Sequence, residues 1–275
     1  MAGMHCNVNL KYGVIMKKDC YTVRISLKPG FMNADQLRAI ADIIEKYGDG
    51  KAHITTRQGI EFDISPEKFK DVDEMLKKAG LNIGSTGNRV RQVVSCIGLR
   101  CYNAIGDSVS LARKIHEEFE GIWVPKKVKV NVSGCPNACT YHKFCDIGVC
   151  YRYKIRIDKN LCNNCGKCKD FCDVNAIDWE NKVIKEICTG EGRCTALCNS
   201  FKAERVISIF VGGKGGRIWK EGKELISLKK EEDVLLVIDE ILLSYSKFGH
   251  GRIADFVDSA GIENLRQNII KKLKN

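Results

Sequence analysis

The residues best suited to chemistry are four cysteines in two tight pairs, Cys96 with Cys101 and Cys135 with Cys139. Basic residues precede each pair, in segments 89–91 and 126–129. Thiolates are preferred ligands of iron–sulfur clusters, zinc and copper, whereas arginine and lysine bind oxyanions. A redox metal held by sulfur beside a group of cations predicts a reductase that acts on a small oxyanion.

A second set of cysteines follows the spacing of bacterial ferredoxins. The run C-x2-C-x2-C-x3-C consists of Cys162, Cys165, Cys168 and Cys172. Zinc is the plainer alternative, but zinc sites usually use two separated pairs of ligands. A later run, Cys188, Cys194 and Cys198, keeps three positions of the same pattern, and Glu191 takes the fourth.

Ferredoxin connectivity exchanges one cysteine between the two runs. It predicts one [4Fe–4S] cluster held by Cys162, Cys165, Cys168 and Cys198. It predicts a second cluster held by Cys172, Cys188 and Cys194. This second cluster is a [4Fe–4S] cluster with Glu191 as the fourth ligand or a [3Fe–4S] cluster, and the alternative for Glu191 is an ordinary solvated side chain.

Composition narrows the class of protein. The chain has 275 residues and 15 cysteines, an odd number clustered at short spacings, which favours metal ligation over disulfides. The formal net charge is +11, but the basic residues are scattered among acids, so we expect no nucleic-acid partner. No apolar run is long enough to span a membrane, and residues 1–20 lack the apolar stretch of a signal peptide, so we expect a cytoplasmic protein.

Four cysteines lie outside any ligand pattern: Cys6, Cys20, Cys145 and Cys150. Free cysteine behaves as a small apolar residue and is among the most buried residue types. We therefore expect these four to be buried thiols.

The elements that must position the first cysteines are readable from periodicity. Residues 1–84 predict strands at 21–27, 53–56 and 60–64, with helices at 33–48 and 65–80. This order indicates a ferredoxin-like α+β sandwich. In the next region we expect a helix near 109–119 and a strand at 128–132. After the cysteine-rich residues 156–201, we expect a strand at 205–211 and a helix around 234–243.

Segment 134–139, Gly-Cys-Pro-Asn-Ala-Cys, together with Cys96 and Cys101, resembles the siroheme–[4Fe–4S] motif of sulfite and nitrite reductases. In that family the last cysteine of the second pair, here Cys139, bridges the cluster to the siroheme iron. The resemblance covers nearly the whole chain outside residues 156–201. That insert resembles those of dissimilatory and anaerobic-type sulfite reductases.

The resemblance implies three parts. Residues 1–84 would form a ferredoxin-like half-domain, and residues 85–155 with 202–275 a siroheme and [4Fe–4S] α/β domain. Residues 156–201 would form an inserted ferredoxin module with two clusters of its own.

The resemblance also implies roles for individual residues outside the cysteines. The expected substrate cations are Arg57, Arg91, Lys127 and Lys129. The expected siroheme contacts are Thr56, Gln58, Asn137, Gly213, Lys214 and Arg217. Because guanidinium stays protonated, the arginines suit anion binding, whereas lysines crowded by other cations can deliver protons.

The implied reaction is the six-electron reduction of sulfite to sulfide. Nitrite reduction to ammonia is the runner-up, and an electron-transfer subunit without catalysis is a second alternative. No flavin or nicotinamide fingerprint is present, so electrons must come from a separate ferredoxin or flavoprotein subunit. Larger family members carry two copies of the catalytic unit, whereas this chain has one. We therefore expect a homodimer or higher homo-oligomer whose active site is shared between copies.

Overall fold

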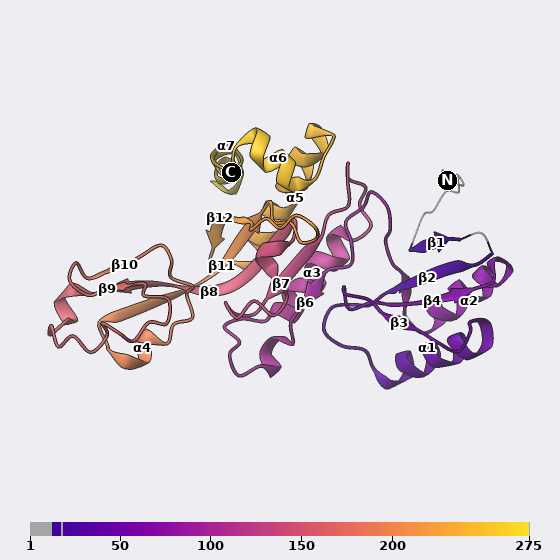
Figure 1. The fold of residues 1–275 in the computed structure, drawn as a ribbon, viewed down its shortest axis with the longest axis horizontal. Coiled ribbons are helices and arrows are strands. Elements are labelled where there is room, and N and C mark those ends of the chain that lie inside the picture. The colour runs from indigo at the N-terminus through magenta and orange to yellow at the C-terminus, as the bar shows by residue number, and fades with distance from the viewer. Residues whose placement is uncertain (1–12, 18, 275) are drawn as a thin grey trace.

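The computed structural model describes residues 13–17 and 19–274. In this part of the chain an N-terminal sheet and a central sheet have five strands each, and a small lobe carries a two-stranded sheet. Figure 1 shows the N-terminal unit and the lobe on opposite sides of the central sheet.

The N-terminal unit is an antiparallel sheet with two helices. Its strands pair in the order β1-β2-β4-β3, and β5 also pairs with β2. The strands are β1 (Val14–Met16), β2 (Tyr21–Ser26), β3 (His53–Ile54), β4 (Ile60–Ile64) and β5 (Asn82–Ile83). The helices are α1 (Ala34–Tyr47) and α2 (Phe69–Lys78). The expected ferredoxin-like α+β character of this unit is confirmed.

Hydrogen bonds made by neighbouring residues set both ends of helix α1. The Asn33 side chain accepts the Gln36 main-chain N–H, and the Gln36 side chain accepts that of Asn33, which is a capping box. Gly48 closes the other end with its N–H on the Ile44 carbonyl. The helix predicted at 33–48 is therefore confirmed to within its caps.

The central sheet has the order β12-β11-β8-β7-β6. Its strands are β6 (Val94–Ser95), β7 (Val130–Ser133), β8 (Ile147–Ile157), β11 (Phe201–Val211) and β12 (Lys223–Leu228). Strands β6, β7 and β8 run parallel, and the remaining pairs are antiparallel. The helices packed on it are α3 (Ser108–Phe119), α5 (Glu231–Phe248), α6 (Ile253–Ala260) and α7 (Ile262–Lys274).

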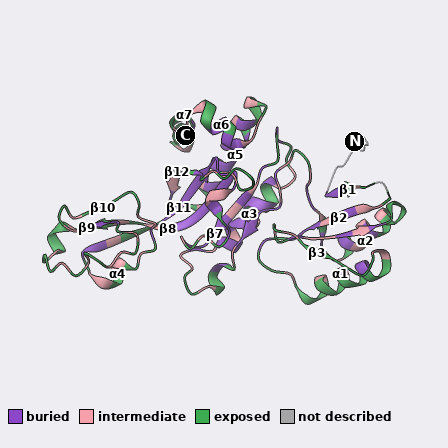
Figure 2. Ribbon diagram, viewed as in Figure 1, coloured by how far each residue is buried: buried purple, intermediate pink, exposed green. Residues whose placement is uncertain are grey.

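Strands β8 and β11 continue beyond the central sheet and lead into the lobe (Figure 1). The lobe contains β9 (Ile177–Asp178), β10 (Val183–Ile184) and α4 (Cys194–Leu197). Figure 2 shows that burial is concentrated in the central sheet and under α1 and α2, whereas the lobe is mostly exposed or half-buried. Between β8 and β11 the buried hydrophobic residues are Ala176 and Ile177, in the part of the chain that the structure describes. A segment with so little apolar core needs metal or another crosslink to hold its fold.

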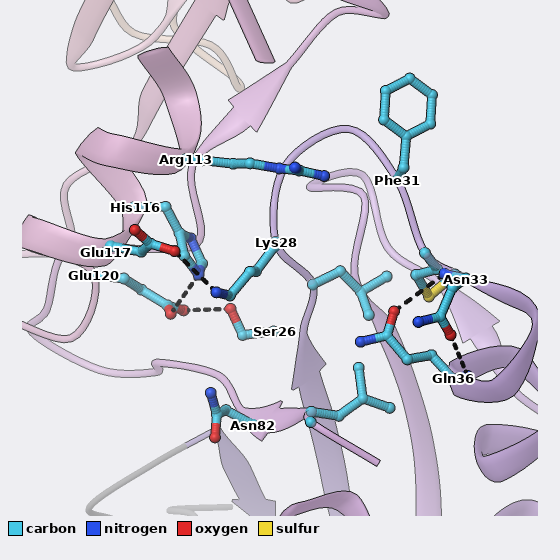
Figure 3. A pocket seen from close by; sticks show the side chains of 14 residues that line it. Ser26, Lys28, Phe31, Asn33, Gln36, Asn82, Arg113, His116, Glu117 and Glu120 are labelled. Atoms are coloured by element: carbon cyan, nitrogen blue, oxygen red, sulfur yellow. Dashed lines mark hydrogen bonds and ion pairs between the residues drawn. The ribbon is translucent and has the colours of Figure 1, made fainter. Parts of the chain in front are cut away.

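The N-terminal unit is joined to α3 by polar contacts around a cavity of about 620 Å³ (Figure 3). Ser26 Oγ donates to Glu120 at 2.7 Å, and Lys28 pairs with Glu117 at 2.9 Å. His116 Nε2 lies 3.3 Å from the second oxygen of Glu120. These contacts fix the carboxyl end of β2 and the residues after it against α3, and so place the N-terminal unit relative to the central sheet.

Some elements are longer than the sequence predicted, and others had no predicted bounds. Strand β11 begins four residues before the expected position, because its first half pairs with β8 on the way out of the lobe. Helices α6 and α7 had no predicted bounds. Among the described residues, no helix combines the length and the apolar character needed to cross a membrane. The division of the chain at residues 84, 155 and 201 remains a prediction.

Candidate active site and cluster sites

One cavity of about 510 Å³ is lined by all four cysteines of the two tight pairs. Cys96 directly follows β6, and Cys135 lies just after β7. Because β6 and β7 are parallel neighbours, their carboxyl ends meet at one edge of the sheet, and the two loops come together there. Cys135 is buried and Cys139 is exposed. The sheet therefore gathers thiols that are far apart in the sequence.

The four thiols lie close together, and as thiolates they would need a positive charge beside them. Gly134 donates its N–H to Cys96 Sγ at 3.2 Å, and Ser108 Oγ lies 3.1 Å from the same sulfur. Burial raises the pKa of Cys135, and the nearby thiols of Cys96, Cys101 and Cys139 raise it further. Four neighbouring thiolates need a bound metal to offset their negative charge. The donor set and the size of the cavity fit an iron–sulfur cluster.

The loop that carries Cys135 and Cys139 has an unusual backbone. Ala138 and Tyr141 have φ values of 56° and 52°, in the left-handed region that residues other than glycine rarely adopt. Tyr141 donates its N–H to the Ala138 carbonyl at 2.7 Å. Backbone strain of this kind concentrates at functional sites.

The predicted siroheme contacts fall into three places. Asn137 and Gln58 line the cysteine cavity. Thr56 lines a different pocket, described below. Gly213, Lys214 and Arg217 line neither of the two. Gly213 is nevertheless required sterically, since a Cβ there would lie 2.2 Å from the carbonyl oxygen of Lys143.

The four predicted substrate cations line a second pocket of about 190 Å³, which we call the cation pocket. They are Arg57, Arg91, Lys127 and Lys129. Arg24 of β2 lines it too and was missed by the sequence analysis, because a charged residue within a strand carries no motif. The cation pocket and the cysteine cavity share no lining residue.

Both arginines of the predicted set are anchored by main-chain carbonyls. Arg57 donates to the carbonyl of Gln92 and, at 3.0 Å, to that of Val130. Arg91 donates to the carbonyls of Ser85 and Gly87 at 2.7 and 2.9 Å. Burial lowers the pKa of Arg57 to about 10, while the charge of Asp146 opposes the fall and that of Arg91 adds to it. Arg57 therefore stays protonated near neutral pH.

The two lysines differ in exposure. Lys127 is exposed, whereas Lys129 is half-buried. Burial lowers the pKa of Lys129, and the charges of Arg57 and Lys127 lower it further. A lysine that releases its proton more readily than usual can act as a proton donor as well as an anion ligand.

In the lobe, the cysteines form two groups that match ferredoxin connectivity. Burial raises the pKa of Cys168, and the neighbouring thiols that add to the rise are Cys162, Cys165 and Cys198. Cys172, Cys188, Cys194 and Glu191 line a separate small cavity of about 50 Å³. Cys198 thus lies with the first run, as the exchange of one cysteine between runs requires. The ligand assignments themselves remain predictions.

Glu191 lies beside the second group but is exposed. Its carboxylate accepts a hydrogen bond from Thr189 Oγ1 at 3.3 Å. Gly190 and Gly192 on either side have φ values of 83° and 86°, and a Cβ on Gly190 would meet the Tyr153 carbonyl at 2.5 Å. The carboxylate therefore sits in a tight loop packed against β8.

Among residues 13–17 and 19–274, no three His, Cys, Asp or Glu side chains converge closely enough for a single metal ion. A cubane spreads its ligands around a cage of eight atoms, which suits more widely spaced thiols. Of the cysteines outside the patterns, Cys145 and Cys150 are buried as expected, and burial raises the pKa of each to about 12. Cys20 is only half-buried, and Cys6 lies outside the described residues.

Comparison with known protein families accounts for both large parts of the chain. Residues 15–79 match the family described as the nitrite/sulfite reductase ferredoxin-like half domain. Residues 86–275 match the nitrite and sulphite reductase 4Fe-4S domain.

Two relatives come from Methanocaldococcus jannaschii. An uncharacterized protein is 76% identical over 98% of this chain and 98% of its own length. A coenzyme F420-dependent sulfite reductase is 33% identical over 86% of this chain, but this covers only 40% of that larger protein.

The fold is shared with a solved structure, the crystal structure of dissimilatory sulfite reductase I. The TM-score is 0.72 with 21% sequence identity, over 91% of this chain and 69% of the other. At this identity the likeness establishes the fold.

Proposed function

Because the chain belongs to the nitrite and sulfite reductase family, we propose that it is a siroheme-dependent reductase that converts sulfite to sulfide. The observation that carries the proposal is the pairing of one cavity lined by four cysteines with one pocket lined by cations. The first suits a redox cofactor and the second suits a small oxyanion. Neither alone would distinguish a reductase from an electron carrier or an anion-binding protein.

The cysteine cavity would hold a [4Fe–4S] cluster through Cys96, Cys101, Cys135 and Cys139. Cys139 is the exposed member, which supports the proposal that it would hold the cluster on the side next to siroheme. Asn137 and Gln58 would contact the cofactor from the cavity wall, while Thr56, Gly213, Lys214 and Arg217 would contact it from outside the cavity. When bound, siroheme and its cluster supply the electrons that reduce the substrate.

The cation pocket would bind and orient the anion. Arg57 and Arg91 have their guanidinium groups fixed by main-chain carbonyls, so their positive charge is preorganised rather than mobile. Lys127 and Lys129 complete the pocket. Lys129 is suited to give up protons as oxygen leaves as water, since burial and the charges of Arg57 and Lys127 lower its pKa.

The separation of the two sites supports an active site shared between two copies of the chain. Arg57 lines the cation pocket and the next residue, Gln58, lines the cysteine cavity, yet the pocket and the cavity share no lining residue. In a two-fold assembly, the cations of one protomer would face the siroheme held by its partner. A homodimer is the smallest assembly that completes the site.

The lobe would carry two ferredoxin-type clusters that accept electrons from an external donor protein. The two cysteine groups and the weak apolar core of the lobe support this role. The donor would be a ferredoxin or a flavoprotein subunit.

Nitrite reduction to ammonia is the second candidate, because the family includes nitrite reductases and the same cations suit both anions. Steady-state kinetics of the anaerobically purified holoprotein, with a chemical reductant and each anion in turn, would distinguish them. We expect sulfide from sulfite at the higher kcat/KM. Siroheme bands without turnover of either anion would favour the electron-transfer alternative, and absence of siroheme would overturn the proposal.

A further inference from the structure

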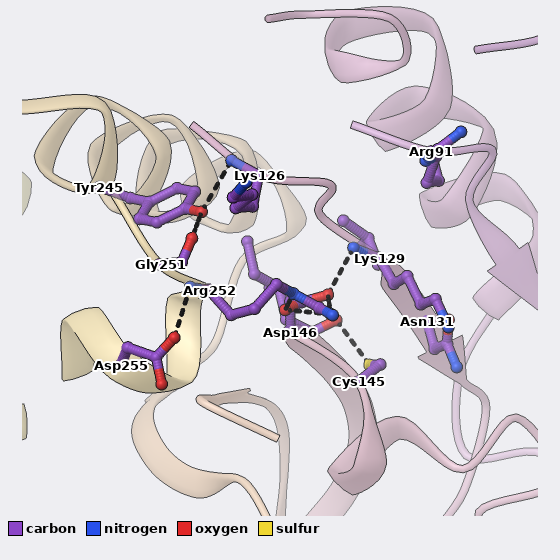
Figure 4. A network of polar contacts seen from close by, with 12 residues as sticks. Arg91, Lys126, Lys129, Asn131, Cys145, Asp146, Tyr245, Gly251, Arg252 and Asp255 are labelled. Carbon is purple, nitrogen blue, oxygen red and sulfur yellow. Dashed lines mark hydrogen bonds and ion pairs between the residues drawn. The ribbon is translucent and has the colours of Figure 1, made fainter. Parts of the chain in front are cut away.

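A buried carboxylate lies directly behind the cation pocket. Asp146 is fully buried, and its carboxylate accepts the main-chain N–H of Lys129 at 2.9 Å. Arg252 donates to both of its oxygens, at 2.7 to 3.1 Å. Figure 4 shows Arg252 reaching Asp146 from the start of α6 while Lys129 reaches it from the segment ahead of β7. A carboxylate in this position is costly unless it is fully paired.

The other end of the same lysine-bearing segment is held from α5. The hydroxyl of Tyr245, a fully buried residue, accepts the Lys126 N–H at 3.1 Å and donates to the Gly251 carbonyl at 2.6 Å. Segment 126–129 is therefore held at one end by Tyr245 of α5 and at the other by Asp146, which Arg252 links to the start of α6 (Figure 4). Its side chains at 127 and 129 enter the cation pocket between these two ties.

We propose that Asp146, Arg252 and Tyr245 are positioning residues of the cation pocket. Asp146 is also the buried counter-charge of Lys129, and Arg252 offsets part of the negative charge of Asp146. This inference rests on the proposed function of the pocket as the anion site. Tyr245 acts through geometry alone. Asp146 and Arg252 act through both geometry and charge.

The charged groups around Lys129 come from every neighbouring element. They are Arg57 from the β3–β4 turn, Lys127 from the same segment, Arg91 and Arg24 from the pocket wall, Asp146 from the loop before β8 and Arg252 from the start of α6. Burial, Arg57, Lys127 and Arg252 lower the pKa of Lys129, and Asp146 raises it. The two members of the buried pair therefore push the charge of Lys129 in opposite directions.

The opposite effects of Asp146 and Arg252 on the pKa of Lys129 provide the test. Anion binding that depends on protonated Lys129 weakens as pH rises through its pKa. Asp146→Asn removes the counter-charge, so this alkaline limb moves to lower pH, by about one unit. Arg252→Gln removes the opposing cation, so the limb moves to higher pH by a similar amount. A purely structural role would weaken binding in both variants without opposite shifts.

The measurement is nitrite affinity of the holoprotein across pH, followed by the visible spectrum, because nitrite keeps one charge over the neutral and alkaline range. The pKa of Lys129 is read in parallel from 13C-labelled lysine by NMR, with Lys129→Arg used to identify its signal. If one of the two variants does not fold, the other decides alone: a shift in its expected direction supports the inference, and no shift overturns it.

Two further variants separate geometry from charge. Tyr245→Phe keeps the buried ring and should weaken nitrite binding about tenfold without moving the alkaline limb, because the Lys126 N–H and the Gly251 carbonyl lose their partner. Arg266→Gln is the matched control, since Arg266 of α7 also donates to main-chain carbonyls, those of Leu225 and Glu224 in β12. It should leave nitrite binding unchanged. If wild-type protein bound no nitrite or sulfite, the proposed function would fall, and the NMR titration would still decide the inference.

Discussion

The side-chain amide of Gln58 pairs with both main-chain groups of Ser95. Its Nε2 donates to the Ser95 carbonyl at 2.8 Å, and its Oε1 accepts the Ser95 N–H at 3.3 Å. Ser95 ends β6, an outer strand of the central sheet, and precedes Cys96. The side-chain amide of Gln58, from the N-terminal unit, therefore hydrogen-bonds to the outer strand of the central sheet as a neighbouring strand would. It fixes the backbone next to Cys96, the first cluster cysteine.

Gln58→Leu should lower the occupancy of the cluster in the cysteine cavity. The change leaves the Ser95 N–H and carbonyl without partners, at a cost of about 1–3 kcal/mol per group, and loosens Cys96. Iron and acid-labile sulfide per siroheme measure the effect. Gln267→Leu, at an exposed position of α7, is the control, and an equal loss in both variants would contradict the role of Gln58.

The thiol of Cys139 should be required for coupling between the cluster and siroheme. Cys139→Ser should abolish the exchange coupling seen by Mössbauer and EPR spectroscopy, because a serine oxygen is a poorer bridge to iron than sulfur. Cys150→Ala, a buried thiol outside the ligand set, should leave the coupling intact. Retained coupling in Cys139→Ser would remove this residue from the bridge.

Glu191 should determine the type of the second cluster in the lobe. Glu191→Cys should give an ordinary [4Fe–4S] signal, and Glu191→Gln should favour a [3Fe–4S] signal because the carboxylate ligand is lost. EPR of the oxidised and reduced protein reports both species. Spectra identical to wild type in both variants would make Glu191 a solvated side chain.

Arg24 should contribute to anion binding although no motif contains it. Its Nε donates to Oε2 of Glu61 at 2.9 Å, and its side chain lines the cation pocket. Arg24→Gln removes a positive charge from the pocket wall and takes the guanidinium partner from Glu61, so we expect about tenfold weaker binding of sulfite and nitrite. Arg38, which pairs with Asp35 on the surface of α1, offers the control: Arg38→Gln should bind both anions normally.

The sequence indicated those features whose causes are local. The cap at Asn33 and the glycine at 48 define α1, and the tight cysteine spacings identify the sites, because each depends on neighbouring residues. Features that depend on tertiary contacts were missed. The resemblance implied different roles for Arg57 and Gln58, but no pattern predicted the left-handed backbone of Gln58, with φ of 61°, at the point where the two come to line different pockets.

Buried charge pairs were missed for the same reason. Asp146 and Arg252 are distant in the sequence and become partners only when α6 packs beside the start of β8. Neither residue belongs to a short motif. Their link to Lys129 passes through a main-chain N–H, which no side-chain pattern records.

The central claim is that the cations of one chain act on the siroheme held by another. Its most direct test is a heterodimer purified through two different tags, with one chain carrying Lys127→Met and Lys129→Met and the other carrying Cys139→Ala. Each variant alone should be inactive as a homodimer. The heterodimer has one intact composite site of two, so it should reduce sulfite at about half the wild-type rate. A heterodimer as inactive as its parents, or a fully active monomer, would contradict the account.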